Sequence, residues 1–127
     1  MGDSTSKTTT FINPIGLIEQ RAIGPQTGVT VRKNIEELVK LIKVLRRQHK
    51  PVLVLIDITG VTKNNLASHK AVVTGMLEVP CDLAAFYGPI SLQVLVNMLS
   101  IVADKSKTIR AFSNRDDALS WLKKGTK

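Results

Sequence analysis

The segment Val52–Ile58 constrains the fold more than any other part of the chain. It begins with five consecutive apolar residues, Val-Leu-Val-Leu-Ile, and lacks the alternation of a strand with one exposed face. A short apolar run that is rich in β-branched residues is typical of a strand buried on both faces. Such strands belong mainly to parallel sheets covered by helices, so this segment predicts an α/β fold.

Helical and strand-like patterns alternate along the rest of the sequence. Apolar residues recur with a helical period in residues 29–49, where Asn34 is the expected N-cap and Pro51 lies just beyond the end. The other expected strands are 17–23, 83–87 and 108–112, and the other expected helices are 64–78, 92–102 and 115–123. This alternation predicts one domain with a mainly parallel sheet and right-handed crossovers.

The N-terminal ten residues differ from the rest of the chain. They are polar and rich in Ser and Thr, so we expect a disordered leader at 1–10 before a single domain at 11–127. They contain no apolar signal segment, and no later apolar run approaches the roughly 18 residues that a membrane span needs. Cys81 is the only cysteine, which excludes an intramolecular disulfide. Together these features predict a cytoplasmic protein.

The formal net charge of +8 raises the question of a polyanionic partner. Lys40, Lys43 and Arg47 form a polar stripe on the helix expected at 29–49, and a basic stripe can neutralise phosphates. Aromatic residues make up only 4% of the chain, and none lies between the basic residues as a platform for base stacking. The pattern therefore does not favour nucleic-acid binding. Weak binding of this stripe to a phosphate backbone or an anionic lipid is our alternative function.

Polar residues follow two of the expected strands, where open α/β sheets bind their ligands. The candidate ligand or switch residues are Asp57, Thr59, Thr62, Asn64, Asn65, Tyr87, Gly88 and Ser91. Backbone amides at the starts of the following helices could hold an anion beside them. The alternative is purely structural, with Asn64 or Asn65 and Ser91 as helix caps and Asp57 ordering a loop at 59–62.

The helix expected at 92–102 is apolar almost all round. Its polar residues form one narrow stripe at Gln93, Asn97 and Ser100. Such a helix either lies between the sheet and its neighbours or leaves an apolar flank for a partner, a lipid or a second copy. The candidate contact residues are Leu95, Val96, Met98 and Leu99.

Catalytic and metal-binding patterns are scarce. His49 and His69 have basic or apolar sequence neighbours, and no acidic residue or cysteine stands at metal-ligand spacing. Cys81 has no base beside it in sequence, and no phosphate-binding glycine motif occurs. We therefore expect no catalytic residue, metal or cofactor. An enzyme would need a cleft that brings Asp57 together with His69 or Tyr87.

Three segments resemble the STAS domains and, more closely, the SpoIIAA-like family. They are "VLVLIDITGVT" at 52–62, "DLAAFYGPISLQVLVNML" at 82–99 and "IRAFSNRDDALSWL" at 109–122. The resemblance spans roughly residues 15–124 and implies a four- to five-stranded, mainly parallel mixed sheet with about four helices. STAS relatives bind partner proteins or nucleotides, and the broader group is similar to lipid-carrier CRAL-TRIO domains.

The chain departs from this family at the phosphorylation element. Phosphorylated STAS proteins carry an Asp-Ser-Ser-Gly-like element after the loop, where this chain has Asn65-Leu66-Ala67-Ser68. The acceptor position falls on Leu66 or Ala67, so we do not expect a serine switch. We expect a non-catalytic regulatory or binding module. It would act through a protein partner, a second copy, or a small apolar or anionic ligand.

Overall fold

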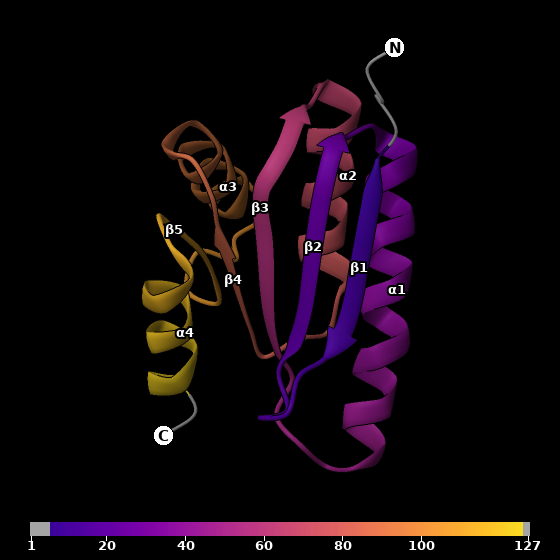
Figure 1. Ribbon diagram of the computed structural model, residues 1–127, viewed down its shortest axis with the longest axis vertical. Helices are drawn as coiled ribbons and strands as arrows, with labels where there is room; N and C mark the ends of the chain where they lie inside the picture. Colours follow the sequence, from indigo (N-terminus) through magenta and orange to yellow (C-terminus); the bar gives the residue numbers. More distant parts are fainter. Residues whose placement is uncertain (1–5, 126–127) are drawn as a thin grey trace.

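A five-stranded mixed sheet forms the centre of the computed structural model, which describes residues 6–125 (Figure 1). The strands stand in the order β1-β2-β3-β4-β5; β1 is antiparallel to β2 and all other neighbours are parallel. They are β1 (Lys7–Ile12), β2 (Ile18–Pro25), β3 (Leu53–Lys63), β4 (Leu83–Tyr87) and β5 (Ile109–Phe112). The helices are α1 (Gly28–Arg47), α2 (Leu66–Glu78), α3 (Ile90–Val102) and α4 (Arg115–Lys124). This architecture confirms the predicted fold class.

The strand β3 is buried on both faces, as its apolar run predicts. Every residue from Leu53 to Ile58 is buried. Val54, Ile56 and Ile58 belong to a core that also includes residues of α1, α2 and α3. Leu53 and Leu55, which point to the other face, pack in a second core with α4. The alternate residues of one strand therefore anchor both layers of helices.

The helices are divided unequally between the two faces, and the strand order explains why. From β2 to β5 each strand lies beside the one before it, so three right-handed crossovers place α1, α2 and α3 on the same face. Only α4 packs on the other face, over β3, β4 and β5. Its Trp121 ring lies 5.6 Å from the Phe112 ring of β5. No described helix covers the β1–β2 half of that face, where Phe11 and Ile23 are exposed.

Helices α1 and α2 approach closely at a glycine. A Cβ atom at Gly75 would lie 2.5 Å from Cδ1 of Ile35, too close for an undisturbed contact. The missing side chain lets α2 pack against α1 on the sheet. It also leaves Ile35 at the edge of a hollow between the helices and the sheet.

The expected disordered leader is wrong for residues 7–10. They form most of β1, which pairs antiparallel with β2 over the register Lys7↔Ile23 to Ile12↔Ile18. The threonines are β-branched and suit a strand. The Thr8 hydroxyl donates to Asn34 Oδ1 at 2.7 Å, and the Thr10 hydroxyl donates to Glu37 Oε2 at 3.0 Å. The remaining expected leader positions, 1–5, lie outside the described residues.

Three local boundaries also differ from expectation. Helix α1 begins at Gly28 with a capping box formed by Thr27 and Thr30, while the expected cap Asn34 is a buried residue within the helix. The expected loop at 59–62 is strand, because β3 continues beside the end of β2. Ser91 does not cap α3, whose N-cap is Pro89 without a side-chain hydrogen bond. Helix α4 has Asn114 as its N-cap, whose side chain accepts a hydrogen bond from the Asp117 amide.

The packing of α4, the single helix on the second face, can be tested by substitution. Leu122 of α4 is fully buried, so Leu122→Ala should lower the free energy of unfolding by about 2–5 kcal/mol. Ser120→Ala, at an exposed position of the same helix, should change it by less than about 0.5 kcal/mol. Urea denaturation followed by circular dichroism measures both. Equal, small effects of the two substitutions would contradict the packing of α4.

Candidate functional site

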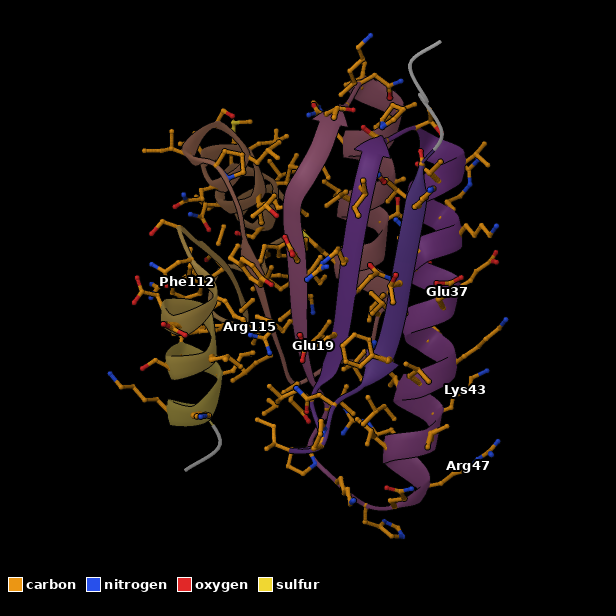
Figure 2. The ribbon with its side chains drawn as sticks, viewed as in Figure 1. Glu19, Glu37, Lys43, Arg47, Phe112 and Arg115 are labelled. Carbon is orange, nitrogen blue, oxygen red and sulfur yellow. The ribbon has the colours of Figure 1, made fainter. Side chains whose placement is uncertain are left out.

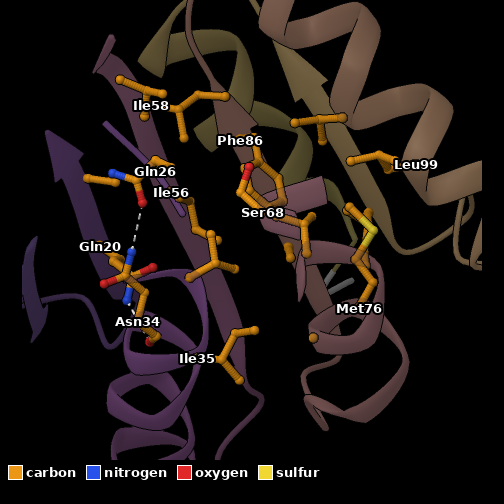
Figure 3. Close-up of a pocket in the computed structure, with 18 of the residues that line it drawn as sticks. Gln20, Gln26, Asn34, Ile35, Ile56, Ile58, Ser68, Met76, Phe86 and Leu99 are labelled. Atoms are coloured by element: carbon orange, nitrogen blue, oxygen red, sulfur yellow. Dashed lines mark hydrogen bonds between the residues drawn. The ribbon is translucent and has the colours of Figure 1, made fainter. Parts of the chain in front are cut away.

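A cavity of about 150 Å³ lies between the sheet and the three helices α1, α2 and α3 (Figure 3). Its walls are almost entirely apolar. The sheet contributes mainly the inward residues of β3 and β4, and α2 and α3 contribute the opposite wall. The apolar lining includes Val54, Ile56, Ile58, Ala84, Phe86, Val72, Met76, Leu92, Leu95, Val96 and Leu99.

Small residues at the sheet and helix surfaces leave this space unfilled. The lining includes Ala22 and Ala84 on the strands and Gly75 and Ser68 on α2. Gly75 is also the point at which α2 closely approaches Ile35 of α1. The space is partly open to solvent, so it is a pocket between the sheet and the helices and not a closed void.

One end of the cavity is formed by three buried side-chain amides, which belong to Gln20, Gln26 and Asn34. Their exposed fractions are 5%, 7% and 8%. Gln20 Nε2 donates to the backbone oxygen of Asn34 at 2.9 Å and to the Thr10 hydroxyl at 3.1 Å. These contacts, with that of Thr8 to Asn34, fasten the amide corner to β1 and α1.

Gln26 is bonded less well than the other two amides. Its Nε2 donates to the backbone oxygen of Gly24 at 3.4 Å. Its Oε1 accepts from Asn34 Nδ2 and from the Thr30 hydroxyl, both also at 3.4 Å. These distances all exceed the usual range for protein hydrogen bonds, about 2.7–3.2 Å. The Gln26 backbone, in contrast, is held by a 2.7 Å bond from its amide to the oxygen of Lys63.

The start of α2 borders the cavity and contains two of the predicted site residues. Asn65 is the N-cap and forms a capping box with Ser68, whose hydroxyl donates to the Asn65 backbone oxygen at 2.7 Å. Asn64 is exposed and lines the cavity, with its Oδ1 2.6 Å from His69 Nε2. Ser68 is 2% exposed, so its hydroxyl serves the helix end and is not presented to solvent.

Asp57, Thr59 and Tyr87 lie on the opposite face of the sheet, away from this cavity. Asp57 Oδ1 accepts from the Thr59 amide at 2.9 Å and from its hydroxyl at 2.6 Å, and Oδ2 pairs with Arg21 Nε at 3.1 Å. Burial by itself would raise the pKa of Asp57, but the Thr59 hydrogen bonds, the Arg21 charge and the Tyr87 hydroxyl together hold this pKa below its ordinary value. Tyr87 stands opposite Asp57 in the β3–β4 register, and burial raises its pKa.

A second ion pair ties α4 to the sheet beside this group. Arg115 binds both carboxylate oxygens of Glu19, and Asn13 Nδ2 donates to the same carboxylate at 2.8 Å (Figure 2). The hydrogen bond from Arg115 is the main cause that lowers the pKa of Glu19. The pKa of Arg115 is raised, chiefly by the same bond. The arrangement ties the start of α4 to a residue of β2.

The candidate ligand or switch residues predicted from the sequence therefore do not form one site. Asp57, Thr59 and Tyr87 share the α4 face, while Asn64 and Asn65 stand at the cavity end. The remaining three are separate: Thr62 and Ser91 are exposed, and Gly88 is buried where a Cβ would lie 2.8 Å from Cγ1 of Ile58. Gly88 thus permits the close approach of β4 to β3.

The residues predicted as a partner surface on α3 point in two directions. Leu95 and Leu99 are half-buried and line the cavity. Val96 also lines it and is 6% exposed, so it is wrong as a surface residue: it faces the core. Met98 is exposed as predicted. It belongs to an outer apolar face of α3, which comprises Ile90, Val94, Met98, Ile101 and Val102, each at least half exposed.

No helix within the described part of the chain is both long enough and apolar enough to cross a membrane.

The basic stripe of α1 lies on the outer side of that helix. Lys40, Lys43 and Arg47 are exposed, and Figure 2 shows Lys43 and Arg47 directed away from the sheet. Arg46 is not part of this stripe, because it pairs with Asp82 at 3.3 Å and donates to the Pro80 backbone oxygen at 2.7 Å. The stripe is separate from the cavity, whose lining includes none of its three cations.

The amides of the cavity were not among the predicted site residues, although the sequence holds a signal for two of them. Gln20 alternates with Ile18 and Ala22 on β2, so it occupies an inward position. Asn34 stands three residues after Val31 and four before Leu38, on the buried face of α1. A polar residue in phase with an apolar pattern indicates a buried polar group. Gln26 carries no such signal, because it lies between β2 and α1.

Comparisons with known proteins define the fold. No protein-family model matches the chain, and no curated protein matches its sequence significantly. A solved structure does match, that of an uncharacterized protein of the DUF3478 family with a SpoIIAA-like fold from Shewanella loihica PV-4. The TM-score is 0.67 at 17% identity, over 96% of this chain and 98% of that chain. The chain therefore has the SpoIIAA-like fold that its sequence predicts.

The lowered pKa values of Glu19 and Asp57 predict acid sensitivity. Their ordinary values are 4.5 and 3.8, so in acid the unfolded chain binds more protons than the folded one. The stabilisation is complete at neutral pH and is lost as the pH falls through the lowered values. We expect urea midpoints to fall steadily below about pH 4.5.

Two variants separate this linkage from general acid denaturation. Glu19→Gln should be less stable than the unaltered protein at pH 7 but should lose less further stability on acidification. Glu36→Gln, at an exposed position of α1, should retain the original pH dependence. If Glu19→Gln loses stability in acid as steeply as the unaltered chain, the role of the Glu19–Arg115 pair is contradicted.

Proposed function

We propose that this chain is a non-catalytic binding module whose cavity takes a small, uncharged and predominantly apolar molecule. The observation that carries the proposal is the 150 Å³ space between the sheet and α1, α2 and α3. An engineered apolar cavity of about this volume in another protein binds benzene, so the space suffices for one small ring. A pocket with apolar walls and a few convergent polar groups is the usual form of a small-molecule site.

The lining favours an uncharged ligand over an anionic one. Among the described residues around the cavity there is no Lys, Arg, Asp or Glu. An ion in this space would lose its hydration without gaining a partner of opposite charge, which is costly in an apolar surrounding. Of the small ligands expected from the sequence, the apolar class therefore fits the cavity and the anionic class does not.

The polar group on the other face supports a non-catalytic role. Asp57 and Tyr87 come together, as an enzyme would require, while His69 borders the cavity on the opposite face. The Asp57 carboxylate already accepts two hydrogen bonds and an ion pair, and its lowered pKa makes it a weak base. The raised pKa of Tyr87 keeps its hydroxyl protonated. These groups serve to hold β3, β4 and α4 together.

A second candidate function is self-association through the outer apolar face of α3. The five residues of this face are 52–76% exposed, and α3 contains no charged residue over its 13 positions. Contiguous exposed apolar surface on a protein marks an interaction site. The inner side of the same helix lines the cavity, so a partner on α3 would bind next to it.

The cavity proposal is tested with p-xylene, a single apolar ring, and two matched valine substitutions on α3. Val96 lines the cavity and Val94 is 62% exposed, so Val96→Phe should abolish p-xylene binding while Val94→Phe should leave it unchanged. Methyl NMR spectra during titration report binding, and thermal unfolding confirms that both variants are folded. Leu99→Phe, also in the lining, serves if Val96→Phe does not fold. The proposal is contradicted if the cavity variants bind p-xylene as well as the unaltered protein does. It is also contradicted if none of these proteins binds p-xylene.

Self-association is tested by sedimentation equilibrium over a concentration series. We expect a reversible dimer whose dissociation constant rises at least about tenfold in the double variant Val94→Ser, Ile101→Ser, because both residues lie on the outer face of α3. The control Val44→Ser removes an exposed valine from α1 and should not change the dimer. An unaltered protein that stays monomeric at every concentration contradicts this second candidate.

A further inference from the structure

We propose that the ligand of the cavity carries one uncharged hydroxyl group, which exchanges hydrogen bonds with the carboxamide of Gln26. This inference rests on the proposed function, because it specifies the ligand for the same cavity. It assigns a recognition role to a residue that lies outside the regular elements, between β2 and α1.

The carboxamide of Gln26 has unused hydrogen-bonding capacity. A carboxamide offers two N–H donors and an oxygen with two lone pairs. The Gln26 side chain is 7% exposed, yet all three of its hydrogen bonds measure 3.4 Å. A buried polar group without good partners costs free energy, so a well-placed ligand atom would relieve this cost.

The groups around the Gln26 carboxamide are held in place by shorter hydrogen bonds. Asn34 and Gln20 are held by bonds of 2.7–3.1 Å to Thr8, Thr10 and the α1 backbone. The backbone amide of Gln26 donates to Lys63 at 2.7 Å. The corner is therefore held on several sides, and its loosely bonded groups are the Gln26 carboxamide and the Asn34 Nδ2 that donates to it at 3.4 Å. A site of this kind is preorganised, because little must move when a ligand binds.

A hydroxyl group matches the hydrogen-bonding chemistry of the amide. A hydroxyl donates one hydrogen bond and accepts others, so it can serve both Nε2 and Oε1 of one carboxamide. A carboxylate can only accept, and its charge would find no cation in the lining. An ammonium group can only donate and would find no anion there. A neutral alcohol or phenol satisfies both conditions.

The apolar part of the ligand would lie on the side of the pocket away from the three amides. Figure 3 shows Gln26, Gln20 and Asn34 together on one side of the pocket, with Met76, Phe86 and Leu99 on the other side. A ligand with its hydroxyl at the amides would direct its apolar part toward these side chains. The volume of 150 Å³ suits one ring with small substituents. p-Cresol and p-xylene are suitable probes, because they have the same shape and differ by a hydroxyl in place of a methyl group.

The experiment measures the dissociation constants of both probes by NMR titration at pH 7, where p-cresol is neutral. The unaltered protein should bind p-cresol at least about tenfold more tightly than p-xylene. Gln26→Met keeps the approximate volume but removes the amide, and it should reduce the ratio to near one through weaker p-cresol binding alone. Gln48→Met, at the exposed C-cap of α1, is the matched control and should keep the original ratio.

The side-chain amide signals of Gln26 supply a readout that does not depend on the variant. They should shift downfield on addition of p-cresol, because a hydrogen bond deshields the donor proton, and p-xylene should produce no such downfield shift. If both compounds bind equally well, or if Gln26→Met keeps the preference for p-cresol, the hydroxyl inference is overturned while the cavity function stands. If neither compound binds, the proposed function fails and this inference fails with it.

Discussion

The burial of β3 on both faces is the constraint on which the rest of the structure depends. Alternate residues of Leu53–Ile58 anchor two separate cores, so each layer of helices is positioned by the same six residues. Because the strands from β2 to β5 follow one another across the sheet, right-handed connections bring three helices to one face and leave one for the other. The two cores then acquire different properties. On the face with a single helix, the ion pair between Glu19 and Arg115 adds to the apolar packing of Ala118 and Leu122 that holds α4.

The three-helix face is where the packing is incomplete. Small residues such as Ala84 and Gly75 allow α1 and α2 to lie close together and close to the sheet, but they leave a space beneath α2 and α3. The side chains that line this partly open pocket lack some of the packing contacts of a closed core. The buried amides at one end add a further cost, because the side chain of Gln26 has only long hydrogen bonds. Both costs fall when a small ligand with a suitable polar atom enters, which links the energetics of this core to the proposed binding role.

Much of the fold is predictable from the sequence, because its determinants are local. The apolar run at Val52–Ile56 and the periodicity of α1 each specify an element and its buried face. β1 is different: its threonines carry no apolar pattern, and the strand exists because β2 offers an edge and α1 offers Asn34 and Glu37 as partners. The prediction that the polar residues after two of the strands form one site is wrong for a related reason. Successive residues of a strand, such as Asp57 and Ile58, point to opposite faces of the sheet, so the side chains around them belong to two different surroundings. The sequence could not identify Gln26 as a site residue. Its proposed role depends on the long hydrogen bonds from its carboxamide to Gly24, Thr30 and Asn34, which only the structure shows.

We propose that the space between the sheet and the helices accepts a small apolar guest, which a crystal structure of the unaltered protein under xenon pressure can test. Xenon occupies apolar cavities without any need for hydrogen bonds. We expect a xenon atom in contact with Val54, Val96 and Leu99, with the backbone of α2 and α3 unchanged. If side chains fill this space and exclude xenon, the pocket does not bind such a guest.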